Sequence, residues 1–414
     1  MPFPTPTSTA KLLKMGFDGC DLAPLRSELL TRSQTNPTDA AALIELSIIE
    51  QMLGRPESGL NYQALALREH TLYRSSWPAS SRALRVLAFV VSGGLSANTP
   101  IDFLLQGSDV VLYSLYVVPG RPLPDVLPEH DIAIVTVGEA DQVRPIMDTI
   151  SQAIPFWPCP VLNRPERILD LSRTQVARIL EGIPGLVVPS TVRIDRTSLA
   201  SIGRSLTQVS QFLPDSTFPL IVRTIGSHAG KNLAKLDTAE AITAYLAVHP
   251  EEEFFLSPYL DYRSSDGLFR KFRLVWVDGH PYPCHMAIAD EWKVWYLNAD
   301  MAASIPKRAE EAFFMSQFDA GFGRRHAAAL AAIAKRFGLE YVGIDCAEMP
   351  DGRLLVFEAD VAFVAHDMDS PDTYPYKRPQ MQKLFTAFYE MLQQKSRIAR
   401  VIAPSDRFRW TVAS

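Results

Sequence analysis

The sequence has few of the features that mark secreted, membrane-spanning or zinc-binding proteins. Its four cysteines are scattered and form no CxxC pair, which argues against a disulfide framework or a zinc knuckle. No apolar run approaches the roughly 20 residues that span a bilayer. The N-terminus is rich in Pro and Thr and lacks the pattern of a signal peptide. We therefore expect a cytoplasmic protein that does not associate with membranes.

The chain also lacks an excess of positive charge. It has 414 residues, 41 Lys and Arg against 46 Asp and Glu, a net charge of −5 and a sequence pI near 5.9. This balance argues against a broad nucleic-acid-binding surface. The 47% hydrophobic content is that of an ordinary globular protein with two or three domains. The sequence leaves open whether the chain forms a homodimer.

Residues 1–80 are expected to form a helical N-terminal extension. Apolar residues recur at helical spacing between Ala42 and Met52, and the segment from Leu53 to Pro56 breaks the pattern. A second helix is expected from about residue 57 to 72. The pair resembles one tetratricopeptide-like hairpin, but a solenoid needs about three repeats and we find no second copy. It is either a small helical appendage or a docking hairpin for a protein partner.

Residues 81–158 are expected to form a Rossmann-like α/β domain. Three apolar runs, at residues 84–91, 110–118 and 131–137, read as buried strands separated by helical stretches. Alternating strands and helices favour a parallel sheet with helices on its faces. A GxGxxG motif is absent, so a dinucleotide site is not expected.

Residues 159–400 mix helices with strands that look antiparallel, which indicates an α+β domain. We expect a smaller lobe at 159–262 and a larger one at 263–400. Helices are predicted at 168–181, at 324–337 before Gly338, and up to about Val248 after a capping box of Asp237 and Glu240. Hairpins are predicted at Asp278-Gly279 and Asp351-Gly352, the dipeptides that type I′ turns prefer.

Three acidic residues stand on the two strands of the second hairpin. If Asp351-Gly352 is a two-residue turn, Asp345 lies opposite Glu358, and Asp360 points to the same face. Like charges facing across a ladder are unfavourable, and a bound Mg²⁺ would resolve the conflict. The alternatives are solvated acids at a sheet edge or a salt bridge to an arginine. A three-residue loop would break this pairing argument.

A small-residue loop follows the strand predicted at residues 218–224. It contains Gly226, Ser227, His228, Gly230 and Lys231, and its backbone N–H groups can approach phosphate oxygens closely. The spacing does not match a Walker A loop, because the glycines are one residue too close and no Ser or Thr follows the lysine. The loop is therefore either a phosphate cradle or an ordinary Gly-rich turn. Arg223 precedes it and either reaches a phosphate or forms a surface ion pair.

The strand predicted at residues 269–277 carries Lys271 and Arg273 on one otherwise apolar side. Cations on such a face are costly to bury without an anionic partner, and a phosphate or a carboxylate would serve. The alternative is a solvated strand face. Upstream, residues 252–261 run from a strand into a loop that can present backbone groups to an adenine edge.

Taken in order, these segments resemble the ATP-grasp ligases, with glutathione synthetase, D-alanine–D-alanine ligase and RimK-type ligases as the nearest named relatives. The resemblance covers about residues 84 to 390. Its most specific part is the pair of segments Gly343-Ile344-Asp345 and Glu358-Ala359-Asp360. It implies an ATP-grasp fold after the Rossmann-like domain, with ATP and Mg²⁺ as cofactors.

The resemblance also implies residue roles. Asp345, Glu358 and Asp360 would hold Mg²⁺, and Arg273 with Lys271 would steady the transferring phosphoryl group. Nucleotide contacts would come from the loop at 226–231 and from Arg173, Arg223, Ser257, Tyr259, Leu260 and Asp261. Asp261 or Asp266 would reach the ribose. The chain departs from the family pattern where Arg173 and Arg223 replace lysines and where Asp360 replaces an asparagine.

The activity implied by the resemblance is the joining of a small-molecule carboxylate to an amine through an acyl-phosphate. Two alternatives stay open at this point. One is a nucleotide-sensing interaction protein without catalysis, and the other is a kinase that releases the phosphorylated carboxylate. His285, Trp292 and His366 are further candidates for substrate contact, and a core or loop role fits each of them as well.

Overall fold

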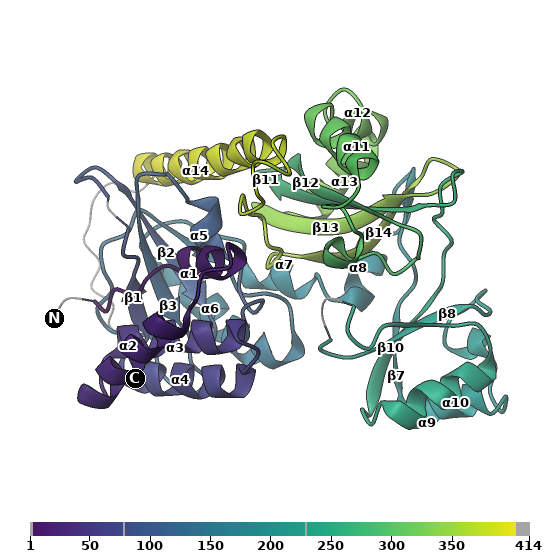
Figure 1. Ribbon diagram of the computed structural model, residues 1–414, viewed down its shortest axis with the longest axis horizontal. Coiled ribbons are helices and arrows are strands. Elements are labelled where there is room, and N and C mark those ends of the chain that lie inside the picture. Colours follow the sequence, from purple (N-terminus) through teal and green to yellow (C-terminus); the bar gives the residue numbers. More distant parts are fainter. Residues whose placement is uncertain (1–2, 78, 228–229, 403–414) are drawn as a thin grey trace.

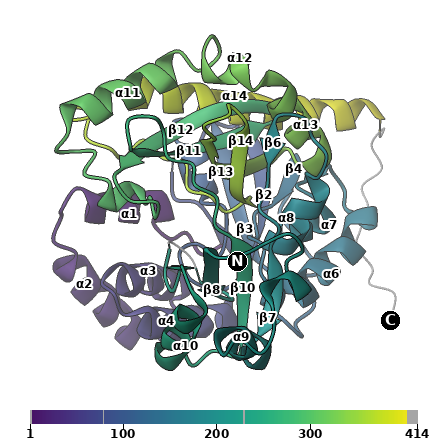
Figure 2. The same cartoon turned by 90° about the vertical axis from the view of Figure 1, so that its right-hand side faces the viewer.

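The computed structural model describes residues 3–77, 79–227 and 230–402, and it has an α/β fold with three sheets (Figures 1 and 2). His228 of the predicted phosphate loop lies outside the described residues. None of the helices in these three ranges is both long and apolar enough to cross a membrane.

The N-terminal helices are α1 (Thr9–Phe17), α2 (Ala23–Thr35), α3 (Ala40–Met52) and α4 (Pro56–Glu69). The two helices predicted for residues 42–72 are confirmed as α3 and α4. Helix α3 is buried along almost its whole length, because α1, α2 and α4 pack around it. Their shared core continues into Tyr73, which contacts Tyr116 edge-on at 5.7 Å between ring centroids. These helices therefore share a core with the sheet that follows them.

The first sheet has the order β1-β3-β2-β4-β5. Its strands are β1 (Leu72–Arg74), β2 (Leu84–Val90), β3 (Val110–Tyr116), β4 (Ile132–Val135) and β5 (Val161–Leu162), with helices α5 (Ile101–Leu104) and α6 (Arg144–Ala153). Strands β2, β3 and β4 pair in parallel, as predicted, and β5 adds a further parallel strand. Strand β1 runs antiparallel to β3. The side chains of β2 and β4 are almost all buried, which explains their continuous apolar runs.

The second sheet forms a small lobe with the order β7-β10-β8-β9. Its elements are β7 (Val192–Asp195), α9 (Arg196–Gly203), β8 (Leu220–Thr224), β9 (Ala234–Leu236), α10 (Ala239–Val248) and β10 (Glu253–Pro258). Helices α9 and α10 pack against each other and close its core (Figure 1). The capping prediction for α10 was wrong by one residue. The N-cap is Thr238 and not Asp237, and its side chain accepts the Ala241 N–H at 3.4 Å.

The third sheet forms the large lobe with the order β12-β11-β13-β14-β6. Its strands are β11 (Phe269–Val277), β12 (His280–Ala289), β13 (Tyr341–Glu348), β14 (Leu354–Asp360) and the short β6 (Leu186–Val187). Helices α11 (Ile305–Ser316), α12 (Phe322–Arg325) and α13 (Ala327–Phe337) lie beside it. Helix α14 (Lys377–Ile402) extends from this lobe over the first sheet (Figure 1).

Two predicted elements differ from the structure in detail. The helix predicted for residues 168–181 is two short helices, α7 (Pro165–Leu169) and α8 (Arg173–Ile179), because Ser172 adopts an extended conformation with ψ 147°. The helix predicted for 324–337 is divided into α12 and α13, and Gly338 ends it in the left-handed region as expected.

The two hairpins of the large lobe turn differently. Val277 pairs with His280, and both Asp278 and Gly279 have positive φ, which confirms a two-residue type I′ turn. The second hairpin has a three-residue loop, since Met349 and Arg353 are joined by a backbone hydrogen bond of 2.8 Å. The prediction of a two-residue turn at Asp351-Gly352 was therefore wrong.

A β-bulge compensates for the longer loop. Next to the loop the pairs are Glu348 with Leu354 and Cys346 with Val356, but beyond the bulge Asp345 pairs with Glu358. One extra residue in β14, Phe357, absorbs the difference. The predicted pairing of Asp345 with Glu358 is confirmed, although the turn that was used to derive it is not.

Candidate active site

The main cavity, of about 850 Å³, lies between the small-lobe sheet, the large-lobe sheet and the loops after the strands of the first sheet. It is lined by most of the predicted site residues: Arg173, Arg223, Gly226, Ser227, Gly230, Lys231, Ser257, Tyr259, Leu260, Lys271, Arg273, Asp345, Glu358 and Asp360. Residues more than 180 positions apart in the sequence thus share one cavity.

The bulge in β14 determines which side chains face this cavity. In a regular strand side chains alternate, so one face would receive only every second residue. Leu355, Glu358 and Asp360 line the cavity from regular ladder positions, and the inserted Phe357 lines it as well. The extra residue therefore lets one strand present an apolar pair and an acidic pair to the same space.

Asp345 forms an ion-pair cluster with the two cations of β11. Its carboxylate accepts from Arg273 Nε at 2.8 Å and Arg273 Nη2 at 3.1 Å, and Lys271 Nζ lies 2.6 Å away. The Asp345 side chain is only 1% exposed. Burial opposes its ionisation, but the charges of Arg273 and Lys271 prevail and hold the pKa of Asp345 well below its ordinary value. The arginine salt bridge left open from the sequence is thus present at Asp345.

Arg273 is held on its other side by an aromatic ring. Its guanidinium lies 4.3 Å from the centroid of Phe363, in the segment after β14. Gly343 makes room for this ring, because a Cβ at that position would come within 2.4 Å of a Phe363 ring carbon. The orientation of Arg273 therefore depends on Asp345, Phe363 and a glycine.

Arg173 and Arg223 approach the cavity from two different elements. Arg173 begins α8 and forms an ion pair with Glu358. Arg223, on β8, is 8% exposed. Burial, with the nearby charge of Arg173, lowers the pKa of Arg223 to about 10. Burial raises the pKa of Glu358, but the charges of Arg173, Lys271 and Arg223 together outweigh it, and the net shift is downward. Two close cations with one carboxylate between them leave a site that favours a further anion.

The small-residue loop folds back over Arg223. Arg223 Nε donates to Ser227 Oγ at 3.2 Å, and Ser227 Oγ donates to the Thr224 carbonyl at 2.7 Å. Gly226 and Gly230 have φ of 73° and 70°, which side chains rarely adopt. Lys293, which the sequence reading missed, donates from Nζ to the Leu233 carbonyl at 3.2 Å. Gly226, Ser227, Gly230 and Lys231 of the loop thus line the cavity together with Lys293, which comes from the segment after β12.

An apolar slot adjoins these donors. Tyr259 and Leu260 line it from the loop after β10, with Leu355 and Phe357 from β14. Trp292 closes it, with its ring 5.9 Å from Tyr259 and nearly perpendicular to it. The slot has the flat apolar walls that an adenine ring needs. Of the candidates with an open role, Trp292 lines the cavity, and His285 and His366 do not.

Two acids proposed for a ribose contact lie elsewhere. Asp261 does not line the cavity; it is exposed and accepts the Arg263 N–H at 3.1 Å. Asp266 forms an ion pair with Arg270 at 2.7 Å on the outer side of β11.

The acidic residues of β14 fit a magnesium ion in part. Mg²⁺ takes one or two carboxylates and completes its shell with water and phosphate oxygens. Glu358 and Asp360 offer two carboxylates on the cavity side of one strand. In the described ranges, however, no three His, Cys, Asp or Glu side chains form a group that can hold a metal. The donor set fits Mg²⁺ held by Glu358 and Asp360, and a metal role for Asp345 stays a proposal.

The first sheet contributes a carboxylate that the sequence reading also missed. Glu139 follows β4, is half-buried and lines the cavity close to Asp360. Burial raises the pKa of Glu139 to about 7, with further contributions from Asp360 and Asp141, and burial raises the pKa of Asp360 to about 6. The sequence did contain a signal for Glu139: it is a polar residue just after a predicted parallel strand, and ligands bind at the carboxyl ends of such strands.

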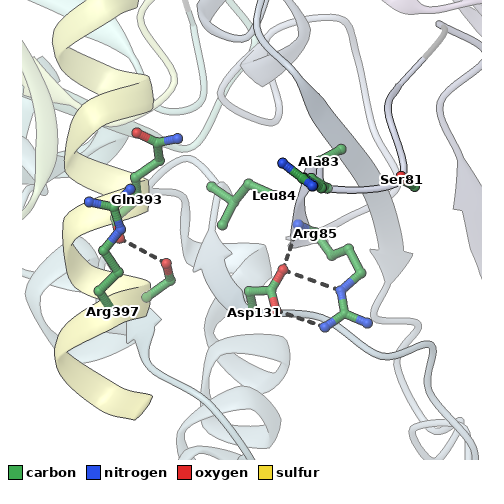
Figure 3. Close-up of a pocket in the computed structure, with 9 residues that line it drawn as sticks. Ser81, Ala83, Leu84, Arg85, Asp131, Gln393 and Arg397 are labelled. Carbon is green, nitrogen blue, oxygen red and sulfur yellow. Dashed lines mark hydrogen bonds and ion pairs between the residues drawn. The ribbon is translucent and has the colours of Figure 1, made fainter. Parts of the chain in front are cut away.

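A second hollow, of about 460 Å³, lies between α14 and the start of β2 (Figure 3). Its charged groups include Arg85, whose Nη2 contacts Asp131 Oδ1 at 2.8 Å, and Arg397 on α14. None of the predicted site residues lines it.

Comparison with known proteins finds similarity only among solved structures. No family model matches the sequence, and no curated protein sequence matches it either. A RimK-domain ATP-grasp protein from Sphaerobacter thermophilus is 13% identical with a TM-score of 0.41, covering 74% of this chain and 99% of that one. D-alanine–D-alanine ligase from Bacillus anthracis complexed with ATP is 12% identical with a TM-score of 0.44, covering 76% and 99%. D-cycloserine synthetase DcsG is 14% identical with a TM-score of 0.41, covering 74% and 99%.

Proposed function

We propose that this chain is an ATP-grasp ligase that joins a carboxylate to an amine through an acyl-phosphate. The observation that carries the proposal is the convergence of four cations, Arg173, Arg223, Lys271 and Arg273, beside the acids of β14 and an apolar slot. Cations on one side and flat apolar walls on the other match a nucleoside triphosphate.

Each part of the cavity has a task in this reaction. The slot at Tyr259 and Leu260 holds the adenine, and the loop at Gly226 and Gly230 donates N–H groups to phosphate oxygens. Arg173 and Arg223 neutralise the phosphates. The loop also covers the reacting atoms, and exclusion of water protects an acyl-phosphate from hydrolysis.

Arg273 and Lys271 act where charge develops. They stabilise the transferring phosphoryl group and the oxyanion that forms when the amine adds to the acyl carbon. Asp345 and Phe363 hold the arginine in position, so little reorganisation is needed during reaction. Mg²⁺ held by Glu358 and Asp360 would supply charge neutralisation at the phosphates.

The test is ADP release with candidate acids and amines, supplied separately and together. Arg273→Ala should lower the rate by about a hundredfold or more, the effect of removing one donor to a developing charge. Arg270→Ala is the matched control, because Arg270 is on the same strand but pairs outward with Asp266 and Glu310. Near-normal ADP release by Arg273→Ala would reject the assignment.

The same assay separates the alternatives. Turnover with acid alone identifies a carboxylate kinase. Nucleotide binding without turnover for any pair identifies a nucleotide-sensing protein, for which the N-terminal helices remain the proposed partner site.

A further inference from the structure

We propose that Glu139 binds the ammonium group of the amine substrate, so that the acceptor enters as a positively charged amine and releases one proton to water before its nitrogen attacks. This inference rests on the proposed ligase function. It concerns the part of the cavity that the first sheet forms, where the loops after β2 and β4 meet the end of β14.

The charges that line the cavity are mostly neutralised within the protein. Asp345 is paired with Lys271 and Arg273, Glu358 with Arg173, and Asp141 with Arg193. Glu139 is different: within residues 3–77, 79–227 and 230–402 its carboxylate has no hydrogen-bond or ion-pair partner. A half-buried carboxylate without a partner is unfavourable unless a ligand supplies the charge.

The backbone fixes Glu139 at this place. Gly138 packs so closely that a Cβ there would lie 3.0 Å from Ala362 Cβ and 3.3 Å from the Ala97 carbonyl. The segment after β2 also contacts the end of β14, where Thr99 Oγ1 donates to the Val361 carbonyl at 2.8 Å. The loop after β4 is thus joined to the end of β14, and Glu139 stands beside Asp360.

Asp360 adds to the preference for a cation. Its Oδ1 accepts the Ala362 N–H at 3.1 Å, which leaves its charge without a cationic partner in the described part of the chain. An acidic wall, in which Asp360 is assigned to Mg²⁺ and Glu139 is left for a further cation, therefore adjoins the cationic wall at Arg173 and Arg223. The cationic wall suits phosphate and carboxylate, and the acidic wall suits an ammonium group.

The experiment measures the KM of two small nucleophiles, ammonium and hydroxylamine, which differ in charge at pH 7. Each is supplied together with the carboxylate that supports ADP release. Glu139→Gln should raise the KM for ammonium about tenfold or more and leave the KM for hydroxylamine and for ATP within about twofold. Glu139→Asp should give a KM for ammonium between those of Glu139→Gln and the wild-type protein. Glu129→Gln is the control, because Glu129 is an exposed carboxylate outside the cavity that pairs with Arg85, and its ammonium KM should not change.

Three outcomes overturn the inference. An unchanged ammonium KM in Glu139→Gln rejects it and leaves the ligase function standing. An equal loss with hydroxylamine shows a structural role for Glu139. A loss of magnesium-dependent ATP binding in calorimetry shows that the cation at Glu139 is the metal. Absence of ADP release by the wild-type protein with every acid and amine rejects the proposed function itself.

Discussion

At the scale of single residues, the site depends on contacts between charged groups and rings that leave no spare room. Phe363 lies over the Arg273 guanidinium only because Gly343 has no side chain. A residue that touches no ligand therefore controls the position of one that does.

Gly343→Ala should displace Phe363 and lower the rate of ADP formation about tenfold or more. It should also lower the free energy of unfolding by about 1–3 kcal/mol, the usual cost of overpacking. Gly94→Ala is the control, since the nearest heavy atom to a Cβ there lies 3.9 Å away. Urea unfolding and ADP assays on both variants check this prediction. Equal activity in the two variants would contradict it.

His130 gives a pH-dependent contribution to stability. Its Nδ1 lies 2.8 Å from the Pro128 carbonyl, and its Nε2 accepts the Trp157 indole N–H at 2.9 Å, which requires a neutral ring. Burial lowers the pKa of His130 below its ordinary value near 6.5. The unfolded chain therefore binds the proton more readily, and stability falls as the pH drops below about 6.5.

His130→Asn should thus destabilise the protein more at pH 8 than at pH 5. The measurement is the free energy of unfolding of both proteins in urea at the two pH values. If His130→Asn lowers the free energy of unfolding by the same amount at both pH values, this role for His130 is ruled out.

At the scale of elements, the second hairpin shows what could be predicted from the sequence. An assumed two-residue turn placed Asp345 opposite Glu358, and this pairing is present because the three-residue loop and the bulge offset each other. Loop length and bulge position were not predictable, because both depend on how β14 packs against its neighbours. The same holds for Ser172, whose extended conformation divides a segment that has helical periodicity throughout.

Contacts between distant segments were the other limit. Lys293 and Glu139 reach the cavity from loops whose paths follow from the packing of lobes and not from local pattern. The residues that were found, such as Arg223 and Arg273, stand on strands whose periodicity is visible in the sequence. Strand-borne site residues were therefore easier to predict than loop-borne ones.

Helix α11 carries two adjacent glutamates with opposite environments. Glu311 is fully buried; it accepts the Met286 N–H at 3.1 Å and the Tyr376 hydroxyl at 2.6 Å, with Lys377 3.5 Å away. The Glu310 side chain is 43% exposed and pairs with Arg270. Of these two glutamates, Glu311 is the one that contacts β12, at Met286, and α14, at Lys377.

Glu311→Ala should lower the free energy of unfolding by about 3–5 kcal/mol, because Lys377 would keep a buried charge with less compensation. Glu310→Ala should change it by about 1 kcal/mol or less, as for other exposed pairs. Chemical denaturation of the two variants tests the contrast. Similar values for both would show that the buried network does not contribute to stability.

At the scale of the whole molecule, the N-terminal helices and α14 join parts that the sequence suggested were separate. Strand β1 extends the first sheet, and Tyr73 continues the helical core onto Tyr116. The Arg121 guanidinium donates to the Leu67 carbonyl at 2.7 Å. Removal of these helices would expose one side of the sheet.

A chain that begins at residue 76 should therefore aggregate or lose much of its cooperative unfolding. Size-exclusion chromatography and circular dichroism during urea unfolding measure this. Leu60→Ser, at an exposed position of α4, is a control that should remain monodisperse. A soluble truncated chain with an unchanged unfolding transition would instead support a detachable appendage.

The bulge at Phe357 also constrains changes of chain length in the hairpin. The three-residue loop and the inserted residue lie on either side of four regular ladder pairs, counting Met349 with Arg353, Glu348 with Leu354, Ala347 with Leu355 and Cys346 with Val356. Losing Phe357 alone would keep Asp345 opposite Glu358 but remove a wall of the slot. In a relative without the inserted residue, strict alternation would keep the counterparts of Leu355, Glu358 and Asp360 on one face, and only the Phe357 side chain would be lost. The length of β14 therefore decides whether the slot has this second apolar side chain, while the acidic residues keep their place.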